Sequence, residues 1–275
     1  MNKSVEKKEK IKRPIVFRLW FKILFLMLSF LPLISQKPYD PTQTAIVISE
    51  VLGSPLIEML PWVRIAGKFA LLAVSLLLLF YRPSRTRIPL IYYTIMLVLV
   101  GFFQNMAFTE NYGFVWLIGN TLLMVFTALF CLNDLVKKQS FFKPENLNRN
   151  RLWVVPLMGL AILMPFGIRD GSMIPALNWS IFSNGAGVAY CFITPVIEGL
   201  LLLYSKGIKK TTLSIISFTG SIFAIFNLMT WFVFIPESWW MGVLHLPLFI
   251  LSVFGIRTAS KEYKAEIAAA QSAAA

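Results

Sequence analysis

Charged residues are scarce in this chain of 275 residues. Asp, Glu, Lys and Arg together make up 14% of it, whereas soluble domains contain about 25%. Apolar residues make up 57%, and 24 of them are Phe. One soluble core could not bury this much apolar surface, and the rest would aggregate in water. The composition excludes a soluble enzyme, a secreted disulfide scaffold and a disordered chain, and it predicts an integral membrane protein.

Residues that bind metals and cofactors are also scarce. The chain has two cysteines and a single histidine, His245. One histidine is too few for the usual zinc site or for haem ligation by two histidines. The sequence has no Cys-x-x-Cys, no His-Glu-x-x-His and no phosphate-binding glycine loop. We therefore expect neither a metal site nor a cofactor.

Long apolar runs are abundant, and they set the predicted fold class. A bilayer core of about 30 Å needs roughly 20 helical residues, and backbone groups in lipid must be hydrogen-bonded internally. We expect an all-α, polytopic transmembrane helical bundle of about eight spans. The predicted spans are 15–35, 61–81, 88–108, 113–133, 152–168, 185–205, 211–233 and 239–256.

The positions of Lys and Arg predict the orientation. With the N-terminus inside, 21 of the 26 Lys and Arg residues lie in the inner segments 3–18, 82–87, 137–151, 206–210 and 257–264. This asymmetry follows the positive-inside rule and places both termini in the cytoplasm of a plasma (inner) membrane protein. Because topology accounts for the basic charge, we expect the lipid bilayer as a partner and no nucleic acid.

The chain divides into three parts by this interpretation. Residues 1–14 form a basic cytoplasmic N-terminal tail, 15–257 the eight-helix transmembrane domain and 258–275 a cytoplasmic C-terminal tail with an alanine-rich, low-complexity end. Two outer segments, 36–60 and 168–184, are longer than a turn requires. They are predicted either as interfacial or re-entrant helices or as surface loops.

The sequence also indicates an internal repeat. Leu76–Arg82 resembles Leu200–Lys206, and each run is followed by the same order of features: an Asn near the outer end of a span, an acidic outer turn and a polar residue early in the next span. The paired residues are Asn105 and Asn227, Glu110 and Glu237, and Asn120 and His245. This order predicts a possible 4+4 parallel repeat, with a site between the halves.

Glu198 is the clearest candidate for chemistry within the spans. It lies eight residues before Lys206, so roughly 12 Å from the inner surface at 1.5 Å per residue. An unpaired ionised carboxylate at that depth costs several kcal/mol. Cys191, Thr194 and Glu198 share one helical face by their spacing. Two interpretations remain open: a proton or cation site, or a carboxyl group bonded to a neighbouring helix.

A second candidate lies toward the outer side. Arg64 and Lys68 are one helical turn apart, and Glu110 and Glu237 lie on the same side of the membrane. Mixed charges there predict an outward-facing polar cavity, or alternatively charges at the level of the lipid headgroups.

A third candidate combines a thiol, an amide and an imidazole. Cys191, Asn227 and His245 fall in the outer halves of three successive spans. This order in an eight-span chain resembles the exosortase and archaeosortase family of membrane transpeptidases, which use a Cys nucleophile. The resemblance implies catalytic roles for these three residues. The chain departs from the family after the Cys, where Phe192 stands instead of a small residue, and after the Asn, where Leu228 stands instead of Arg.

Three functions follow from these candidates. The first is a non-enzymatic protein that binds or transports a small solute, ion or lipid near Glu198, Asn105, Asn120 and Asn227. The second is an accessory subunit of a larger membrane complex, with other membrane subunits as partners. The third is an exosortase-like enzyme that acts at the outer face.

Overall fold

The computed structural model describes residues 13–59, 61–81, 85–169, 172–177, 179–182 and 184–273. The first twelve residues of the predicted basic tail, Arg82, and the last two alanines lie outside the described residues. Five positions in the two outer segments 36–60 and 168–184 also lie outside them.

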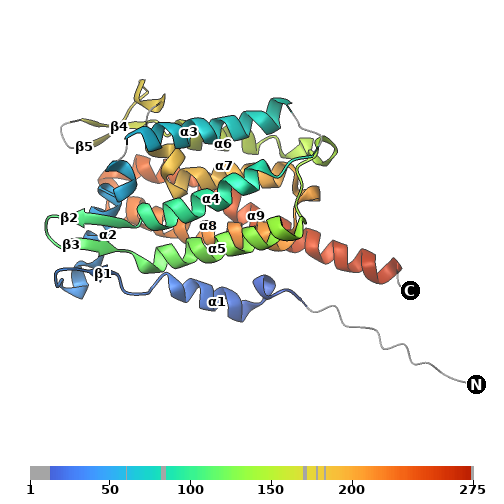
Figure 1. The fold of residues 1–275 in the computed structure, drawn as a ribbon, viewed down its shortest axis with the longest axis horizontal. Coiled ribbons are helices and arrows are strands. Elements are labelled where there is room, and N and C mark those ends of the chain that lie inside the picture. Colours follow the sequence, from blue (N-terminus) through green and yellow to red (C-terminus); the bar gives the residue numbers. More distant parts are fainter. Residues whose placement is uncertain are drawn as a thin grey trace, which may run out of the picture.

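Helices dominate the structure, which confirms the all-α class, and they run side by side in an elongated bundle (Figure 1). Two of them, α3 and α8, continue directly into π-helical turns at Leu77–Tyr81 and Thr230–Phe234. The helices are α1 (Leu19–Leu28), α2 (Thr44–Gly53), α3 (Pro61–Leu76), α4 (Ile88–Phe103), α5 (Ile118–Lys137), α6 (Val154–Leu163), α7 (Tyr190–Leu203), α8 (Lys210–Met229) and α9 (Trp239–Ala273).

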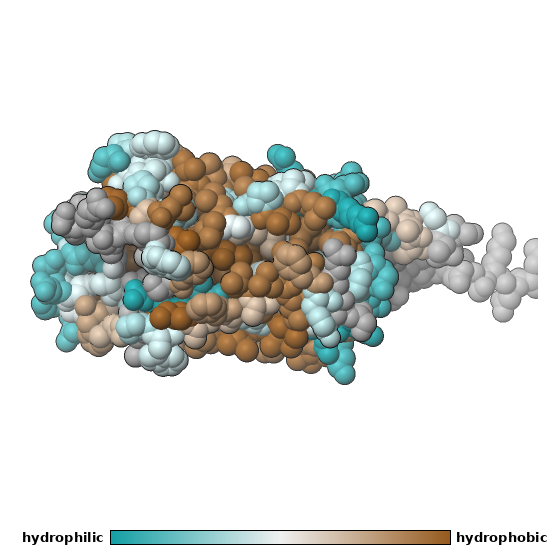
Figure 2. Space-filling view, turned by 90° about the horizontal axis from the view of Figure 1, so that it is seen from above, coloured by the Kyte–Doolittle hydropathy of each residue, from teal (hydrophilic) through white to brown (hydrophobic). Residues whose placement is uncertain are grey.

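Among the described residues, four helical segments are long and apolar enough to cross a membrane: Pro61–Tyr81, Ile118–Lys137, Lys210–Phe234 and Pro236–Ser272. The other apolar helices, α1, α4, α6 and α7, have 10 to 17 residues, fewer than the roughly 20 that a bilayer core requires. The number of spans therefore stays a prediction. On the face shown in Figure 2, apolar residues dominate the middle of the molecule and hydrophilic residues gather toward both ends, as a membrane position requires.

The boundaries of several predicted spans are wrong. The span predicted at 152–168 contains the helix only from Val154 to Leu163 and ends in a strand. The span predicted at 15–35 contains the helix only from Leu19 to Leu28. The spans predicted at 88–108 and 113–133 enclose a β-hairpin instead of a short helical turn, because α4 ends at Phe103 and α5 begins at Ile118. Between them, β2 (Met106–Thr109) pairs with β3 (Gly113–Trp116). The apolar residues of these strands continue the hydropathy of the helices, which hid the change of structure from the sequence pattern.

The segments 36–60 and 168–184 fold as part of a cap on one end of the bundle (Figure 1). Strand β1 (Ile34–Ser35) adds to β3, so the small antiparallel sheet has the order β1-β3-β2. Segment 36–60 contains α2, and Val47 and Val51 of α2 form a separate apolar cluster with Ala107 and Val115 of the sheet. Segment 168–184 takes part in a second hairpin, of β4 (Phe166–Arg169) and β5 (Ser172–Pro175).

Helix α7 runs through the centre of the bundle. It contacts α4, α6, α8 and α9, which surround it. Thirteen of its fourteen residues are buried, and Cys191 is the exception. Polar side chains on α7 therefore meet other helices rather than lipid, and this position determines the geometry of the candidate site.

Candidate functional site

A row of polar side chains runs along one face of α7. Tyr190, Thr194 and Glu198 are spaced four residues apart, so they lie one above another on the helix. All three are buried. The hydroxyl oxygens of Thr194 and Tyr93 on α4 are 3.1 Å apart, which joins the row to a second helix. The predicted partner of this row, Cys191, contacts α8 instead.

Glu198 lies at the C-terminal end of the row and is fully buried. The hydroxyl of Ser252 on α9 is 3.0 Å from each carboxylate oxygen and donates to the carboxylate. Within the described part of the chain, no Lys, Arg or His forms an ion pair with Glu198. Its carboxyl group is thus surrounded by helices and is bonded to a neutral donor.

Small residues let the helices close around this carboxyl group. A Cβ atom at Gly220 of α8 would lie 2.3 Å from Ser252 Oγ and 3.0 Å from Glu198 Oε1. A Cβ atom at Gly255 of α9 would lie 2.1 Å from the hydroxyl of Ser217. We call Glu198, Ser217, Gly220 and Ser252 the Glu198 site. The two glycines allow α8 and α9 to approach the carboxyl group at a distance that any larger residue would prevent.

Two further hydroxyls, those of Ser217 and Tyr190, lie along the row. Among the described residues neither forms a hydrogen bond of ordinary geometry, although Ser217 interacts with the Glu198 carboxyl group and Tyr190 with Thr194. Buried hydroxyls usually form such a bond. Between α4 and α7, next to Tyr190 and Thr194, a crevice is too narrow to admit a water molecule. Glu198 itself is fully buried, and its hydrogen-bond partner in the described structure is a neutral hydroxyl.

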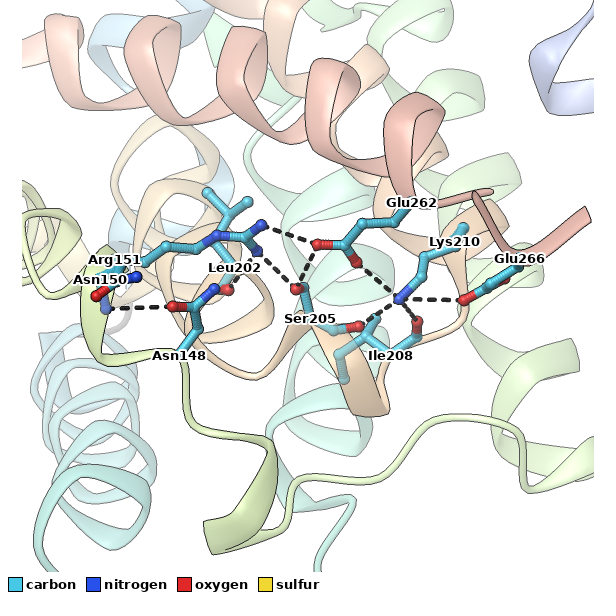
Figure 3. A network of polar contacts seen from close by, with 9 residues as sticks. All are labelled: Asn148, Asn150, Arg151, Leu202, Ser205, Ile208, Lys210, Glu262 and Glu266. Atoms are coloured by element: carbon cyan, nitrogen blue, oxygen red, sulfur yellow. Dashed lines mark hydrogen bonds and ion pairs between the residues drawn. The ribbon is translucent and has the colours of Figure 1, made fainter. Parts of the chain in front are cut away.

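A second, partly buried cluster, at the opposite end of α7 from Tyr190, provides a contrast (Figure 3). Glu262 of α9 binds Arg151 Nη2 at 2.8 Å and Lys210 Nζ at 2.9 Å. Lys210 is 4% exposed and also donates to the backbone oxygens of Ser205 and Ile208. We call Arg151, Ser205, Lys210 and Glu262 the inner clamp. Its carboxylate is neutralised by cations, whereas that of Glu198 is not.

The outer cationic stripe is only partly assembled. Lys68 is buried, and its ammonium group donates to Asn184 Oδ1 at 2.6 Å and to the backbone oxygen of Leu163 at 3.4 Å. Arg64 lies one turn earlier on α3 and is half-exposed. The predicted acids Glu110 and Glu237 are exposed at the capped end, and neither pairs with Lys68 in the described structure. Lys68 therefore holds α3 to the segment that precedes α7.

The predicted asparagines occupy separate positions. Asn105 is buried and donates from Nδ2 to the backbone oxygen of Gly101 at 3.0 Å, which closes the end of α4. Asn120 is half-buried on α5. Neither forms a hydrogen bond with Glu198 in the part of the chain that is described.

Two members of the thiol, amide and imidazole group do meet. Asn227 Nδ2 lies 3.3 Å from Cys191 Sγ. The His245 ring is 5.3 Å from the ring of Phe192, the neighbour of Cys191, but its Nδ1 atom lies 2.7 Å from the backbone oxygen of Met241. No hydrogen bond joins Cys191 to His245 among the described residues. The arrangement brings the three residues to one region without forming a nucleophile–base pair.

Ser252 was not predicted from the sequence. It lies seven residues after His245, so the two share a face of α9, and this spacing is the only signal that could have found it. Serine is common in packed membrane helices. Only the packing of α9 on α7 identifies Ser252 as the partner of Glu198. Groups of three His, Cys, Asp or Glu residues that could hold a metal ion are absent from the described residues.

No protein-family model, curated protein or solved structure matches this chain. The resemblance to exosortases therefore depends on Cys191, Asn227 and His245 alone.

Proposed function

We propose that this protein is an integral membrane protein that binds a proton or a small monovalent cation at Glu198 and transports it across the membrane. The observation that supports the proposal is the environment of the carboxyl group, which is fully buried and contacts hydroxyl groups but no cationic side chain. An ionised carboxylate in such a place needs a positive charge beside it. A bound cation supplies that charge, and a proton removes the need for it.

The proposal includes a topology. The eight apolar helices α1 and α3–α9 span the inner membrane, and both termini lie in the cytoplasm. The cap of α2 and the two hairpins then lies on the outer side. The central α7 contributes Glu198 at the interface between the proposed halves, where repeat proteins place their sites. Tagging of the loop 138–150 and of the β2–β3 hairpin with a membrane-impermeant thiol reagent, after introduction of single cysteines, tests this orientation.

A hydrophobic carbodiimide tests the proposed charge state, because this reagent reacts with protonated carboxyl groups in apolar surroundings. We expect modification of Glu198 in the detergent-purified protein, located by peptide mass spectrometry, and protection by the cation that is bound. The Glu198→Gln variant provides the blank. If Glu198 stays unmodified while the reagent labels exposed acids such as Glu145, the proposed site is wrong.

Flux in proteoliposomes tests transport. The wild type should carry protons, Na⁺ or K⁺ down an imposed gradient, whereas Glu198→Gln should carry none while eluting as a folded protein. Glu145→Gln removes an exposed carboxylate from an inner loop and provides the matched control. Equal flux in all three proteins would remove Glu198 from the mechanism.

The contact between Asn227 and Cys191 favours a second candidate function, an exosortase-like transpeptidase with Cys191 as the nucleophile and His245 as the base. This function requires a rearrangement that brings His245 to Cys191. Labelling of Cys191 by a thiol reagent from the outer side, with Asn227→Ala as the comparison, tests it. An unreactive Cys191 would exclude this enzyme.

The accessory-subunit function stays a prediction. Exposed apolar residues can pack against partner helices as well as against lipid. Purification in mild detergent separates the alternatives, because a stable, monodisperse monomer that supports flux needs no partner.

A further inference from the structure

An open cavity of about 470 Å³ lies at the end of the bundle where α4 begins and α5 ends, away from the cap. Three cationic side chains line it: Arg85, Arg87 and Lys138. The remaining wall is formed largely by Phe141, Ile88 and Ile91. No carboxylate lines the described cavity, so its positive charge is uncompensated from within.

The two arginines are held in place by their neighbours. The guanidinium carbon of Arg85 lies 3.4 Å from the centroid of the Phe141 ring, and that of Arg87 lies 5.3 Å from it. Arg87 Nη1 also donates to the backbone oxygen of Leu135 at 3.0 Å. Stacking on an aromatic ring fixes a guanidinium group and leaves the N–H groups at its rim available. These groups match the spacing of phosphate oxygens.

The backbone around the cavity is also fixed. Thr86 and Phe142 exchange two backbone hydrogen bonds, of 3.0 and 2.9 Å, which join the segment before α4 to the segment after α5. Lys138 ends α5 in a left-handed conformation with φ of 54°. The three cations therefore converge on one cavity because of the fold, although they lie up to 53 residues apart in sequence.

The apolar wall continues along the bundle surface. Ile88, Ile91 and Ile95 are 46%, 45% and 54% exposed. Their spacing places them in one stripe on α4. The stripe begins at the cavity and runs toward the apolar middle of the molecule. A positively charged cavity next to an exposed apolar stripe matches a molecule with an anionic head and an aliphatic chain.

We propose that this cavity binds the phosphate group of an anionic phospholipid, with one acyl chain lying along Ile88, Ile91 and Ile95. Basic pockets at the cytoplasmic ends of transmembrane helices are suited to such headgroups. Inorganic phosphate shares the charge but cannot use the apolar stripe, which favours the lipid. The proposal rests on the membrane position and orientation given under the proposed function, but it involves neither Glu198 nor transport, so it can fail or succeed independently of the proposed cation site.

Native mass spectrometry of the full-length protein in detergent tests the proposal, with phosphatidylglycerol, phosphatidylcholine and inorganic phosphate as probes. The wild type should retain phosphatidylglycerol and not the other two. The double variant Arg85→Gln, Lys138→Gln removes two cations that make no side-chain bond to the backbone in the described structure. We expect about fivefold weaker binding for each charge removed, hence about 25-fold in the double variant.

A matched control is Arg149→Gln, Lys206→Gln, which removes two exposed cations outside the cavity and should leave binding unchanged. A third variant, Ile91→Gln, should weaken binding of phosphatidylglycerol while preserving all the charges. Equal retention of phosphatidylglycerol by the double variant and the wild type would overturn the proposal, as would equal retention of phosphatidylcholine. Binding of inorganic phosphate as tight as that of phosphatidylglycerol would also overturn it, because the acyl chain would then contribute nothing.

Discussion

Glu198 and Glu262 have different surroundings within the bundle. Glu262 in the inner clamp receives hydrogen bonds from Arg151, Ser205 and Lys210, and its charge is neutralised by two cations. Glu198 is deeper, at 0% exposed against 25% for the Glu262 side chain, yet its described partner is the neutral Ser252.

This difference in partners indicates different roles for Glu262 and Glu198. The inner clamp ties α9 to the loop before α6 and to the start of α8, so its charges serve to hold segments together. Glu198 contacts a neutral hydroxyl and forms no ion pair in the described structure, which is the observation behind the proposed proton or cation site.

Glu198→Gln should produce the largest effect, a complete loss of cation flux. Gln has nearly the same shape and retains an oxygen that accepts a hydrogen bond from Ser252, so the free energy of unfolding should change by no more than about 1 kcal/mol. Flux in proteoliposomes, measured beside thermal unfolding in detergent, checks both statements. If the variant unfolds instead, Glu198 has a structural role, as Glu262 does.

Glu262→Ala should lower stability and leave the cation flux unchanged. Removal of this carboxylate leaves Lys210, which is 4% exposed, and Arg151 without their main counter-charge. The free energy of unfolding should fall by about 2–3 kcal/mol, which is somewhat less than the loss for a fully buried pair. Thermal unfolding of the purified protein measures this loss. Flux per folded molecule should stay at the wild-type value, and its disappearance would show that the inner clamp takes part in transport.

Ser252→Ala should have a smaller effect, and it should change both the free energy of unfolding and the cation flux. Loss of the hydroxyl leaves the Glu198 carboxyl group without its described donor, at a cost of about 1–2 kcal/mol. The pH dependence of flux should also shift, because the hydroxyl interacts differently with the two protonation states of Glu198. A normal pH profile would mean that Ser252 only fills space. Ser252→Thr, which retains the hydroxyl, is the matched comparison.

Glu266→Ala should have the smallest effect. The Glu266 side chain is 59% exposed and lies 3.5 Å from Lys210. Exposed ion pairs contribute less than about 1 kcal/mol. Unfolding temperatures of this variant and of Glu262→Ala, measured side by side, test whether burial determines the strength of each pair. Equal losses would contradict this explanation.

The sequence by itself indicated that most of the chain lies in the hydrocarbon of a membrane rather than in water. Long apolar runs with few charges specify helices in hydrocarbon, because unsatisfied backbone groups are too costly there. This local rule identified the helical class and Glu198 as an unusual residue. It failed between Asn105 and Leu117, where the β2–β3 hairpin begins and ends with apolar residues that resemble the ends of the helices that it joins.

Only the tertiary structure decided which groups meet. Lys68 contacts Asn184 rather than an acid, and Glu198 contacts Ser252, a residue that no motif distinguishes. The cavity of Arg85, Arg87 and Lys138 likewise exists only because two distant segments pair at Thr86 and Phe142. Hydropathy depends on each residue and its near neighbours in sequence, whereas these contacts depend on how the helices rotate and pack against one another. A single sequence does not contain that information in any local pattern.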